Sequence, residues 1–213
     1  MTVQIEVVSD VVCPWCFIGK RRLEAALRAL REAADAPSVA VAWRPFQLNP
    51  DLPDEGMDRE AYVRRKFGAN AGQVYGRVSA VGREVGIDFD FTAIRRQPNT
   101  LAAHQLIALA GSAGRQDAMV ERLFRAYFLE AADLTQSQVL VDLAVQAGLE
   151  REVVEADLAD SARNWAVANE EQAARAMGVE GVPFFVFDRR LAVSGAQEPE
   201  VLVQAIRRAA TAG

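Results

Sequence analysis

Apolar and polar residues in the N-terminal part of the chain follow two different periods. Val3–Val8 is rich in β-branched residues and ends at a polar pair, which predicts a short buried strand. From Pro14 to about Ala34 the leucines recur every three or four residues, which is typical of a helix with one apolar face. Val39–Trp43 is again apolar and predicts a second strand. These elements form a βαβ unit, which we expect to have parallel strands and a right-handed crossover.

The middle of the chain, from Pro50 to about Gly178, carries almost only helical patterns. The predicted helices are Arg59–Phe67, Ala71–Val85, Thr100–Ala110, Gln116–Glu130, Ser137–Ala147 and Ser161–Met177. We therefore predict that residues 51–178 form an inserted all-helical domain. Most of its larger aromatic residues are predicted to lie in the core and to have no catalytic role: Tyr75, Phe124, Tyr127, Phe128 and Trp165.

Strand patterns return after Gly181. Phe184–Phe187 and Leu191–Val193 are separated by a short polar segment, which predicts a hairpin. The last segment, about Pro199–Ala210, has apolar residues at helical spacing. The order of elements is therefore β-α-β, a helical insert and β-β-α. This order predicts an α/β fold in which residues 1–50 and 179–213 form one domain.

Composition and charge narrow the classes of function. The chain has 213 residues, of which 51% are hydrophobic and 25% charged, and these values are typical of a folded globular protein. Its net charge of −5 provides no basic surface for nucleic acid. The N-terminus lacks the pattern of a secretory signal, and no apolar segment is long enough to span a bilayer. We therefore expect a cytoplasmic protein with no membrane or nucleic-acid partner.

The two cysteines of the chain, Cys13 and Cys16, lie where the period changes from strand to helix. In a reducing compartment a close pair is more often catalytic or metal-binding than structural. The unpaired N–H groups and the dipole at a helix start favour a thiolate on Cys13, and Pro14 suits the first helical position. Cys16, in the first turn, is within reach for a disulfide. We predict that Cys13 attacks a substrate disulfide and that Cys16 resolves the mixed disulfide.

A zinc site is one alternative for this pair. A structural zinc ion needs four ligands, whereas the chain has no further cysteine and a single histidine, His104. Carboxylates would have to complete the site, so we predict no metal.

His104 lies in an apolar helical run, a pattern that favours a buried structural histidine over a catalytic one.

A second element of the site is predicted at Gly181-Val182-Pro183. A proline at the start of a strand is most often structural. If the Val182–Pro183 bond is cis, however, the backbone of Val182 turns outward beside Cys13, where a substrate peptide can pair with it by β-augmentation. We therefore predict that Val182 and Pro183 bind substrate together with Pro14 and Trp15, which provides a large apolar surface but no cationic imidazole.

These residues resemble a known family. The stretch Asp10-Val11-Val12-Cys13-Pro14-Trp15-Cys16-Phe17-Ile18-Gly19-Lys20-Arg21-Arg22-Leu23 is similar to the opening of DsbA-family proteins of the FrnE-like branch. Later segments that resemble this branch are Trp43–Pro50, Asn99 with Ala103-His104, Gly181–Phe185 and Ser194–Gln197. The resemblance implies a thioredoxin fold with an inserted helical domain, dithiol–disulfide chemistry and a cis peptide at Val182–Pro183. The resemblance also implies that His104 is a candidate residue of the substrate groove and a candidate proton shuttle.

The chain departs from exported DsbA proteins in two ways. Those proteins carry Pro-His where this chain has Pro14-Trp15, and the expected export signal is missing. Loss of the histidine should leave the reduced thiolate less stabilised and the couple less oxidising. We therefore expect a cytosolic reductant, isomerase or glutathione-linked exchanger. Its partners would be protein disulfides and thiols, or glutathione as a co-substrate with no other cofactor, and it would be a monomer or a homodimer.

The sequence does not exclude two alternative functions. The 2-hydroxychromene-2-carboxylate isomerases and kappa-class glutathione transferases share the overall arrangement, but they usually have serine in place of Cys13 and need no second cysteine. The intact pair therefore favours redox chemistry. The rival from another class is a non-catalytic protein that binds zinc or a peptide in the groove.

Overall fold

The computed structural model describes residues 2–33 and 35–211, and its central element is a four-stranded sheet. The strands lie in the order β2-β1-β5-β6. β1 pairs with β2 in parallel and with β5 antiparallel, and β5 pairs antiparallel with β6. Their bounds are Thr2–Ser9 for β1, Ser38–Pro45 for β2, Phe184–Phe187 for β5 and Leu191–Ser194 for β6. The predicted parallel unit and the C-terminal hairpin are confirmed.

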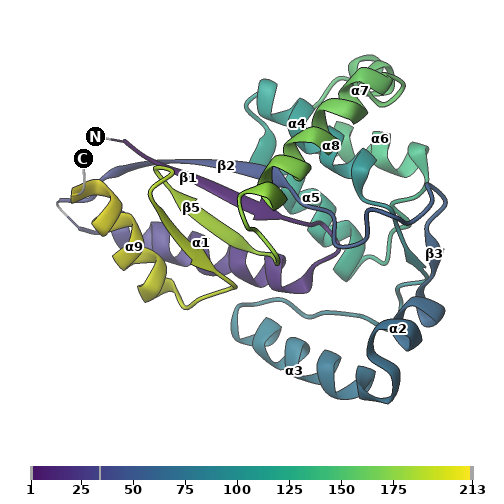
Figure 1. Ribbon diagram of the computed structural model, residues 1–213, viewed down its shortest axis with the longest axis horizontal. Helices are drawn as coiled ribbons and strands as arrows, with labels where there is room; N and C mark the ends of the chain where they lie inside the picture. Colours follow the sequence, from purple (N-terminus) through teal and green to yellow (C-terminus); the bar gives the residue numbers. More distant parts are fainter. Residues whose placement is uncertain (1, 34, 212–213) are drawn as a thin grey trace.

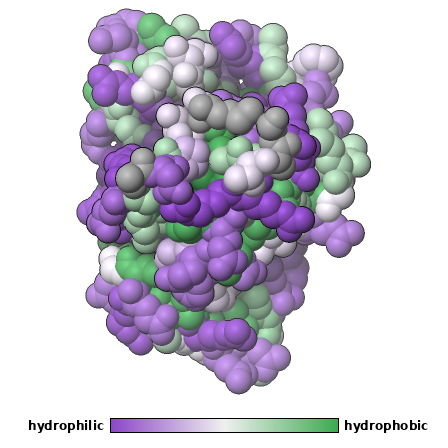
Figure 2. Space-filling view, turned by 90° about the vertical axis from the view of Figure 1, so that its left-hand side faces the viewer, coloured by the Kyte–Doolittle hydropathy of each residue, from purple (hydrophilic) through white to green (hydrophobic). Residues whose placement is uncertain are grey.

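One face of the sheet is covered by α1 (Pro14–Arg31) and α9 (Pro199–Thr211), which lie side by side (Figure 1). Val3, Ile5 and Val7 alternate along β1 and are buried in one core with residues of both helices. α1 was predicted to reach about Ala34, but it ends at Arg31, and Ala34 lies outside the described residues. At the end of the molecule nearest the chain termini, hydrophilic residues cover most of the surface, with apolar residues visible between them (Figure 2).

The segment between β2 and β5 is mostly helical, as predicted. Its helices are α2 (Arg59–Phe67), α3 (Ala71–Glu84), α4 (Leu101–Ser112), α5 (Gln116–Leu129), α6 (Ser137–Gln146), α7 (Arg151–Leu158) and α8 (Ser161–Ala176), with a 3-10 turn at Gly68–Asn70. The order of elements gives a thioredoxin fold with a helical insertion. In the described part of the chain, no helix combines the length and apolar character needed to cross a membrane.

The sequence patterns missed two features of the insert. α7 (Arg151–Leu158) has only eight residues, which are too few for its apolar residues to repeat over several helical turns. β3 (Met57–Asp58) and β4 (Arg96–Gln97) form an antiparallel pair at the base of α2. Strands of two residues are too short to show an alternating pattern.

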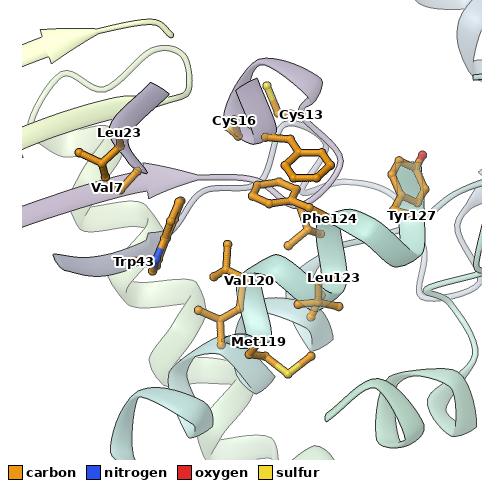
Figure 3. Close-up of a cluster of buried hydrophobic side chains, with 14 of the residues drawn as sticks. Val7, Cys13, Cys16, Leu23, Trp43, Met119, Val120, Leu123, Phe124 and Tyr127 are labelled. Atoms are coloured by element: carbon orange, nitrogen blue, oxygen red, sulfur yellow. The ribbon is translucent and has the colours of Figure 1, made fainter. Parts of the chain in front are cut away.

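Aromatic side chains join the insert to the start of α1. Phe17, directly after Cys16, stacks on Phe124 of α5 with ring centroids 5.0 Å apart. Figure 3 shows Phe124 and other α5 side chains near the helical turn that carries the cysteines. The insert therefore packs directly against the helix that carries the cysteines. Of the aromatic residues of the insert, most of which were predicted to lie in the core, Phe124, Tyr127 and Phe128 are buried, Tyr75 is half-buried and Trp165 is 71% exposed.

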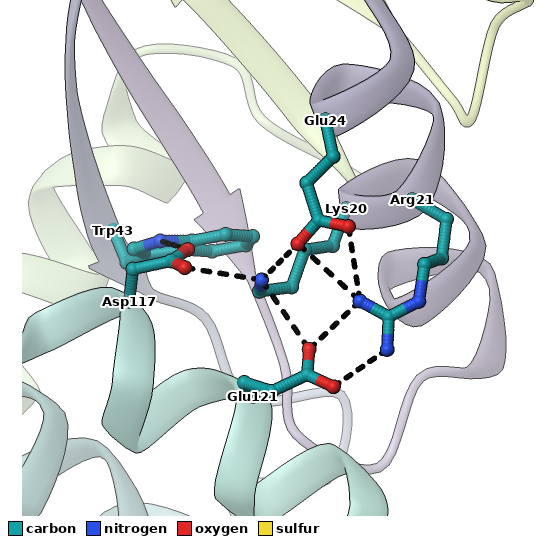
Figure 4. A network of polar contacts seen from close by, with 6 residues as sticks. All are labelled: Lys20, Arg21, Glu24, Trp43, Asp117 and Glu121. Carbon is teal, nitrogen blue, oxygen red and sulfur yellow. Dashed lines mark hydrogen bonds and ion pairs between the residues drawn. The ribbon is translucent and has the colours of Figure 1, made fainter. Parts of the chain in front are cut away.

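A buried ion cluster makes a second connection between α1 and α5 (Figure 4). The side chain of Lys20 is only 2% exposed, and its ammonium lies 3.1 Å from Asp117 and 3.3 Å from Glu121. It also pairs with Glu24, one turn along α1. Arg21 pairs with Glu24 and Glu121, so each cation contacts carboxylates from both helices. The cluster therefore ties α5 of the insert to α1.

Candidate active site

Cys13 is the N-cap residue of α1, with extended backbone angles of φ −93° and ψ 112°. Pro14 occupies the start of the helix, where its missing N–H removes no intrahelical bond. The N–H of Cys13 donates to the carbonyl of Asp10 at 3.0 Å, and the N–H of Cys16 donates to the carbonyl of Cys13 at 3.0 Å. This turn holds both cysteines on the helix tip, as predicted from the sequence.

The two thiols differ in environment. Both are free, and Cys13 is 5% exposed whereas Cys16 is 1% exposed. Burial raises the pKa of the Cys16 thiol well above its usual value, and the hydrogen bond and charge of Cys13 raise it further. The Ser9 side chain and the Asp10 backbone act in the opposite direction. Cys16 is therefore held as a thiol, and Cys13 is the slightly more exposed of these two buried residues.

The segment before β5 lies against Cys13. The Val182–Pro183 peptide bond is cis, as the family resemblance implies. The Cys13 thiol donates to the Val182 carbonyl, with 3.6 Å between sulfur and oxygen. Val182 is half-buried and Pro183 is buried. Residues that are far apart in the sequence are thus brought to one place, beside Pro14 and Trp15, which are both half-buried.

Gly19 contributes to this site, although sequence reasoning gave it no role. It lies on the face of α1 that meets Pro183, and a Cβ atom on Gly19 would come within 2.9 Å of the Pro183 Cγ and 3.3 Å of the Phe185 ring. Only a residue without a side chain allows this approach. A glycine inside a helical pattern was the available signal, since glycine costs helix stability and its presence there indicates a packing reason.

We expect Gly19→Ala to destabilise the protein and to slow its thiol chemistry. Alanine is favoured over glycine in a helix by about 1 kcal/mol, but overpacking typically costs about 1–3 kcal/mol. The extra methyl group pushes against Pro183, so we expect a lower free energy of unfolding and slower alkylation of Cys13. Gly76→Ala in α3 is the matched control, because its Cβ would meet open space and should stabilise the protein. If the two substitutions changed the free energy of unfolding in urea equally, a steric role for Gly19 against Pro183 would be contradicted.

Asp10 and His104 form a buried polar pair next to the loop that precedes Cys13. Asp10 is fully buried, and its Oδ2 accepts the N–H of Leu48 at 2.7 Å. The His104 Nε2 lies 3.0 Å from the Phe46 carbonyl and 3.4 Å from Asp10 Oδ1. His104 is 3% exposed, so its contacts are with this loop rather than with the molecular surface. Sequence reasoning treated Asp10 only as a loop residue, although an acidic residue directly after a buried strand was visible.

Two further residues position the loop that contacts Asp10. Asn99 accepts the N–H of Leu101 at 2.9 Å at the start of α4, and it also accepts from the Gln47 side chain at 2.8 Å. The Asn99 side-chain oxygen therefore ties the start of α4 to the loop after β2. Among the residues that the structure describes, no group of three or more histidine, cysteine or acidic side chains is arranged to hold a metal ion.

Comparison with known proteins identifies a family model and a solved structure that are both DsbA-like. The family model of DSBA-like thioredoxin domains matches residues 4–207. The chain is similar to the structure of a probable DsbA oxidoreductase from Streptomyces coelicolor, with 34% identity, a TM-score of 0.87 and coverage of 98% of this chain and 90% of that chain.

Two solved structures with lower identity share the fold. For a 2-hydroxychromene-2-carboxylate isomerase, identity is 15%, the TM-score is 0.75, and coverage is 96% of this chain and 95% of that chain. The second is the cytosolic disulfide reductase DsbM from Pseudomonas aeruginosa, in a structure with GSH. Its identity is 19%, the TM-score is 0.57, and coverage is 98% of this chain and 96% of that chain.

Proposed function

Because the chain belongs to the family of DSBA-like thioredoxin domains and is a thiol–disulfide oxidoreductase, we propose that Cys13 and Cys16 are its working dithiol. The observation that carries the proposal is the difference between the two sulfurs. Cys13 caps the helix and contacts the Val182 carbonyl, whereas Cys16 is buried and its pKa is raised. Cys13 is therefore the attacking residue and Cys16 the resolving residue.

The proposed reaction runs in two exchange steps. In the reducing direction, the Cys13 thiolate attacks one sulfur of a substrate disulfide, forms a mixed disulfide and releases the other sulfur as a thiolate. Cys16 then loses its proton and attacks the Cys13 sulfur, which forms the Cys13–Cys16 disulfide and releases the second substrate thiolate. The substrate gains two electrons, the dithiol loses two, and the released thiolates take up protons. The oxidising direction is the reverse.

The substrate surface that we propose comprises Pro14, Trp15, Val182 and Pro183. The edge at Val182 suits the backbone of an extended peptide, and the Trp15 ring offers it an apolar contact. Protein disulfides and glutathione are both candidate partners, and DsbM, whose name describes a cytosolic disulfide reductase, was solved with GSH. We accordingly propose glutathione as a co-substrate and the cytoplasm as the compartment.

A glutathione-dependent isomerase or transferase is the second candidate, and the fold shared with 2-hydroxychromene-2-carboxylate isomerase favours it. That activity would need Cys13 only to hold or position a thiol and would not consume the Cys13–Cys16 pair. The pairing of both cysteines on one helical turn supports redox chemistry over this candidate.

The experiment that tests the proposal is equilibration of the protein with glutathione buffers of stepped redox ratio. Alkylation and mass measurement then count the free thiols. We expect both cysteines to be blocked under oxidising buffers and both to be alkylated under reducing buffers, with one reversible transition. Free thiols at every ratio would reject redox function and leave the isomerase candidate. Stoichiometric zinc in the purified protein would support a non-catalytic binding protein.

A further inference from the structure

A cavity of about 660 Å³ lies between α2, α3 and the segment that follows α3, and Figure 1 shows these two helices next to each other. It is lined neither by the two cysteines nor by the residues of the proposed substrate surface. One of its walls is Phe89, which also packs edge-on against Phe17 with ring centroids 6.1 Å apart. A layer of aromatic rings therefore separates this cavity from the helix that carries the cysteines.

Arg59, the first residue of α2, brings a buried positive charge to this cavity. It is 7% exposed and forms no ion pair with a carboxylate in the part of the chain that the structure describes. Its Nη2 donates to the Tyr75 hydroxyl at 2.8 Å and its Nη1 to the Gln97 side-chain oxygen. Arg59 Nε and Gln97 Nε2 are both buried and have no acceptor among the described residues. The cluster therefore has more donors than acceptors and a charge that its neutral partners do not balance.

A second arginine, Arg95, lines the same cavity from an exposed position. Its carbonyl accepts the N–H of Arg59 at 3.0 Å, which holds the two residues side by side. The rings of Tyr62 and Tyr75 lie 5.3 Å and 5.7 Å from the guanidinium carbon of Arg59 and stabilise the cation, but they carry no negative charge. The cavity therefore offers one buried and one exposed guanidinium to an anion.

Three carboxylates also line the cavity, and they limit the charge that a ligand can carry. Asp58 caps α2 with its side chain, and Asp90 accepts hydrogen bonds from its own turn. The side chain of Glu60 is 88% exposed. These groups therefore do not neutralise Arg59, but they repel further negative charge. A ligand with one carboxylate suits this balance better than a doubly charged phosphate.

Aromatic rings and small residues shape the rest of the cavity. Tyr75 stacks on Phe91 with ring centroids 4.4 Å apart, and Phe91 stacks on Phe89 at 5.0 Å. Gly72 and Gly76 line the cavity from α3, and a Cβ atom on either glycine would meet open space. The glycines thus leave room for a flat apolar group against the rings, as in many small-molecule sites.

We propose that this cavity binds a small aromatic monocarboxylate. The carboxylate lies toward Arg59 and Arg95 and supplies the negative charge that the buried cluster lacks, since guanidinium–carboxylate pairs are among the strong polar contacts of proteins. The aromatic body lies against Phe89 and Phe91. The inference goes beyond the proposed disulfide chemistry and does not depend on Cys13.

Isothermal titration calorimetry with naphthoate tests the site. Naphthamide is the uncharged analogue of the same size, acetate is the acid without an aromatic body, and naphthyl phosphate is the dianion. We expect the protein to bind naphthoate about tenfold more tightly than each of the three, because a hydrogen-bonded charge typically contributes at least that factor. Failure of naphthoate to bind, or equal affinity for naphthoate and naphthamide, would overturn the proposal. Tighter binding of naphthyl phosphate would overturn the choice of a monocarboxylate.

Two variants locate the ligand. Arg59→Gln removes the charge and should abolish the preference for naphthoate over naphthamide. Gly76→Leu places a side chain in the cavity and should weaken binding of naphthoate about tenfold or more. Gln73→Leu is the matched control, because Gln73 is exposed on α3 and does not line the cavity, so it should bind naphthoate as the wild type does. Equal affinities of the two leucine variants would overturn the location.

If Arg59→Gln does not fold, as judged by circular dichroism, the ligand series on the wild type and the two leucine variants decide the question. Cys13→Ser should bind naphthoate with unchanged affinity. Failure of the proposed function gives a different result, because it appears as the lack of a reversible Cys13–Cys16 disulfide in glutathione buffers and leaves the calorimetry unchanged.

Discussion

Replacing Cys13 with serine is expected to reduce disulfide exchange to the rate seen without protein. The serine hydroxyl keeps the size and the N-cap position of the residue, but it does not ionise near neutral pH, and the thiolate is the nucleophile in this reaction. Because Cys13 caps α1 without a side-chain hydrogen bond, the substitution should leave the fold intact. Reduction of a disulfide-bonded protein substrate by the variant, followed with a thiol reagent, measures the loss.

Cys16→Ala is the matched variant, and it should fail in a different way. Its Cys13 can still attack, but no second thiol is available to release the substrate, so a mixed disulfide should accumulate on Cys13. Non-reducing electrophoresis and mass measurement detect this species. Substantial exchange by Cys13→Ser would reject the assigned nucleophile, and full turnover by Cys16→Ala would reject the resolving role.

The parts of the fold that the sequence predicted are those with long and regular patterns. β1 and α1 have clear periods, and the change of period between them located both cysteines and the start of the helix. The hairpin of β5 and β6 was likewise predicted because its apolar runs flank a polar turn. Local patterns thus specified the elements, and the chirality of βαβ units specified their parallel pairing.

The rest of the site depends on contacts between distant segments, which no local pattern encodes. The close approach of Gly19 to Pro183 joins residues more than a hundred positions apart and requires the folded sheet. Asp10 and His104 come from different parts of the chain, and each alone looks like a loop residue or a core residue. The family resemblance brought His104 near the site, but the carboxylate that faces it became visible only in three dimensions.

The ion cluster of Lys20 is a further contact of this long-range kind, and we expect Lys20→Met to cause a large loss of stability. Burial alone would lower the pKa of Lys20, but the hydrogen bond to Glu24 and the charges of Asp117 and Glu121 outweigh it, so the pKa is raised. Removing one partner of a fully buried ion pair costs about 3–5 kcal/mol. The remaining carboxylates are partly exposed and Arg21 still pairs with two of them, so the expected loss is about 2 kcal/mol.

The pH dependence of this loss distinguishes charge from packing, because methionine retains most of the lysine stem. Burial alone would raise the pKa of Glu121, but hydrogen bonds and charges from Arg21 and Lys20 lower it below its usual value. A lowered carboxyl pKa contributes stability that is present above the unfolded value and disappears as pH falls through the folded value. The difference between wild type and Lys20→Met should therefore be full at neutral pH and shrink only below about pH 4.

Urea unfolding of both proteins across this range measures the difference, with Arg28→Met on the exposed side of α1 as the control. Arg28→Met should change the free energy of unfolding by less than about 0.5 kcal/mol, as is usual for surface substitutions. If the Lys20→Met loss stayed constant into acid, the cluster would act through packing of the lysine stem. If the loss narrows as the carboxylates are protonated, the charges of Lys20 hold the insert against the helix that carries Cys13 and Cys16.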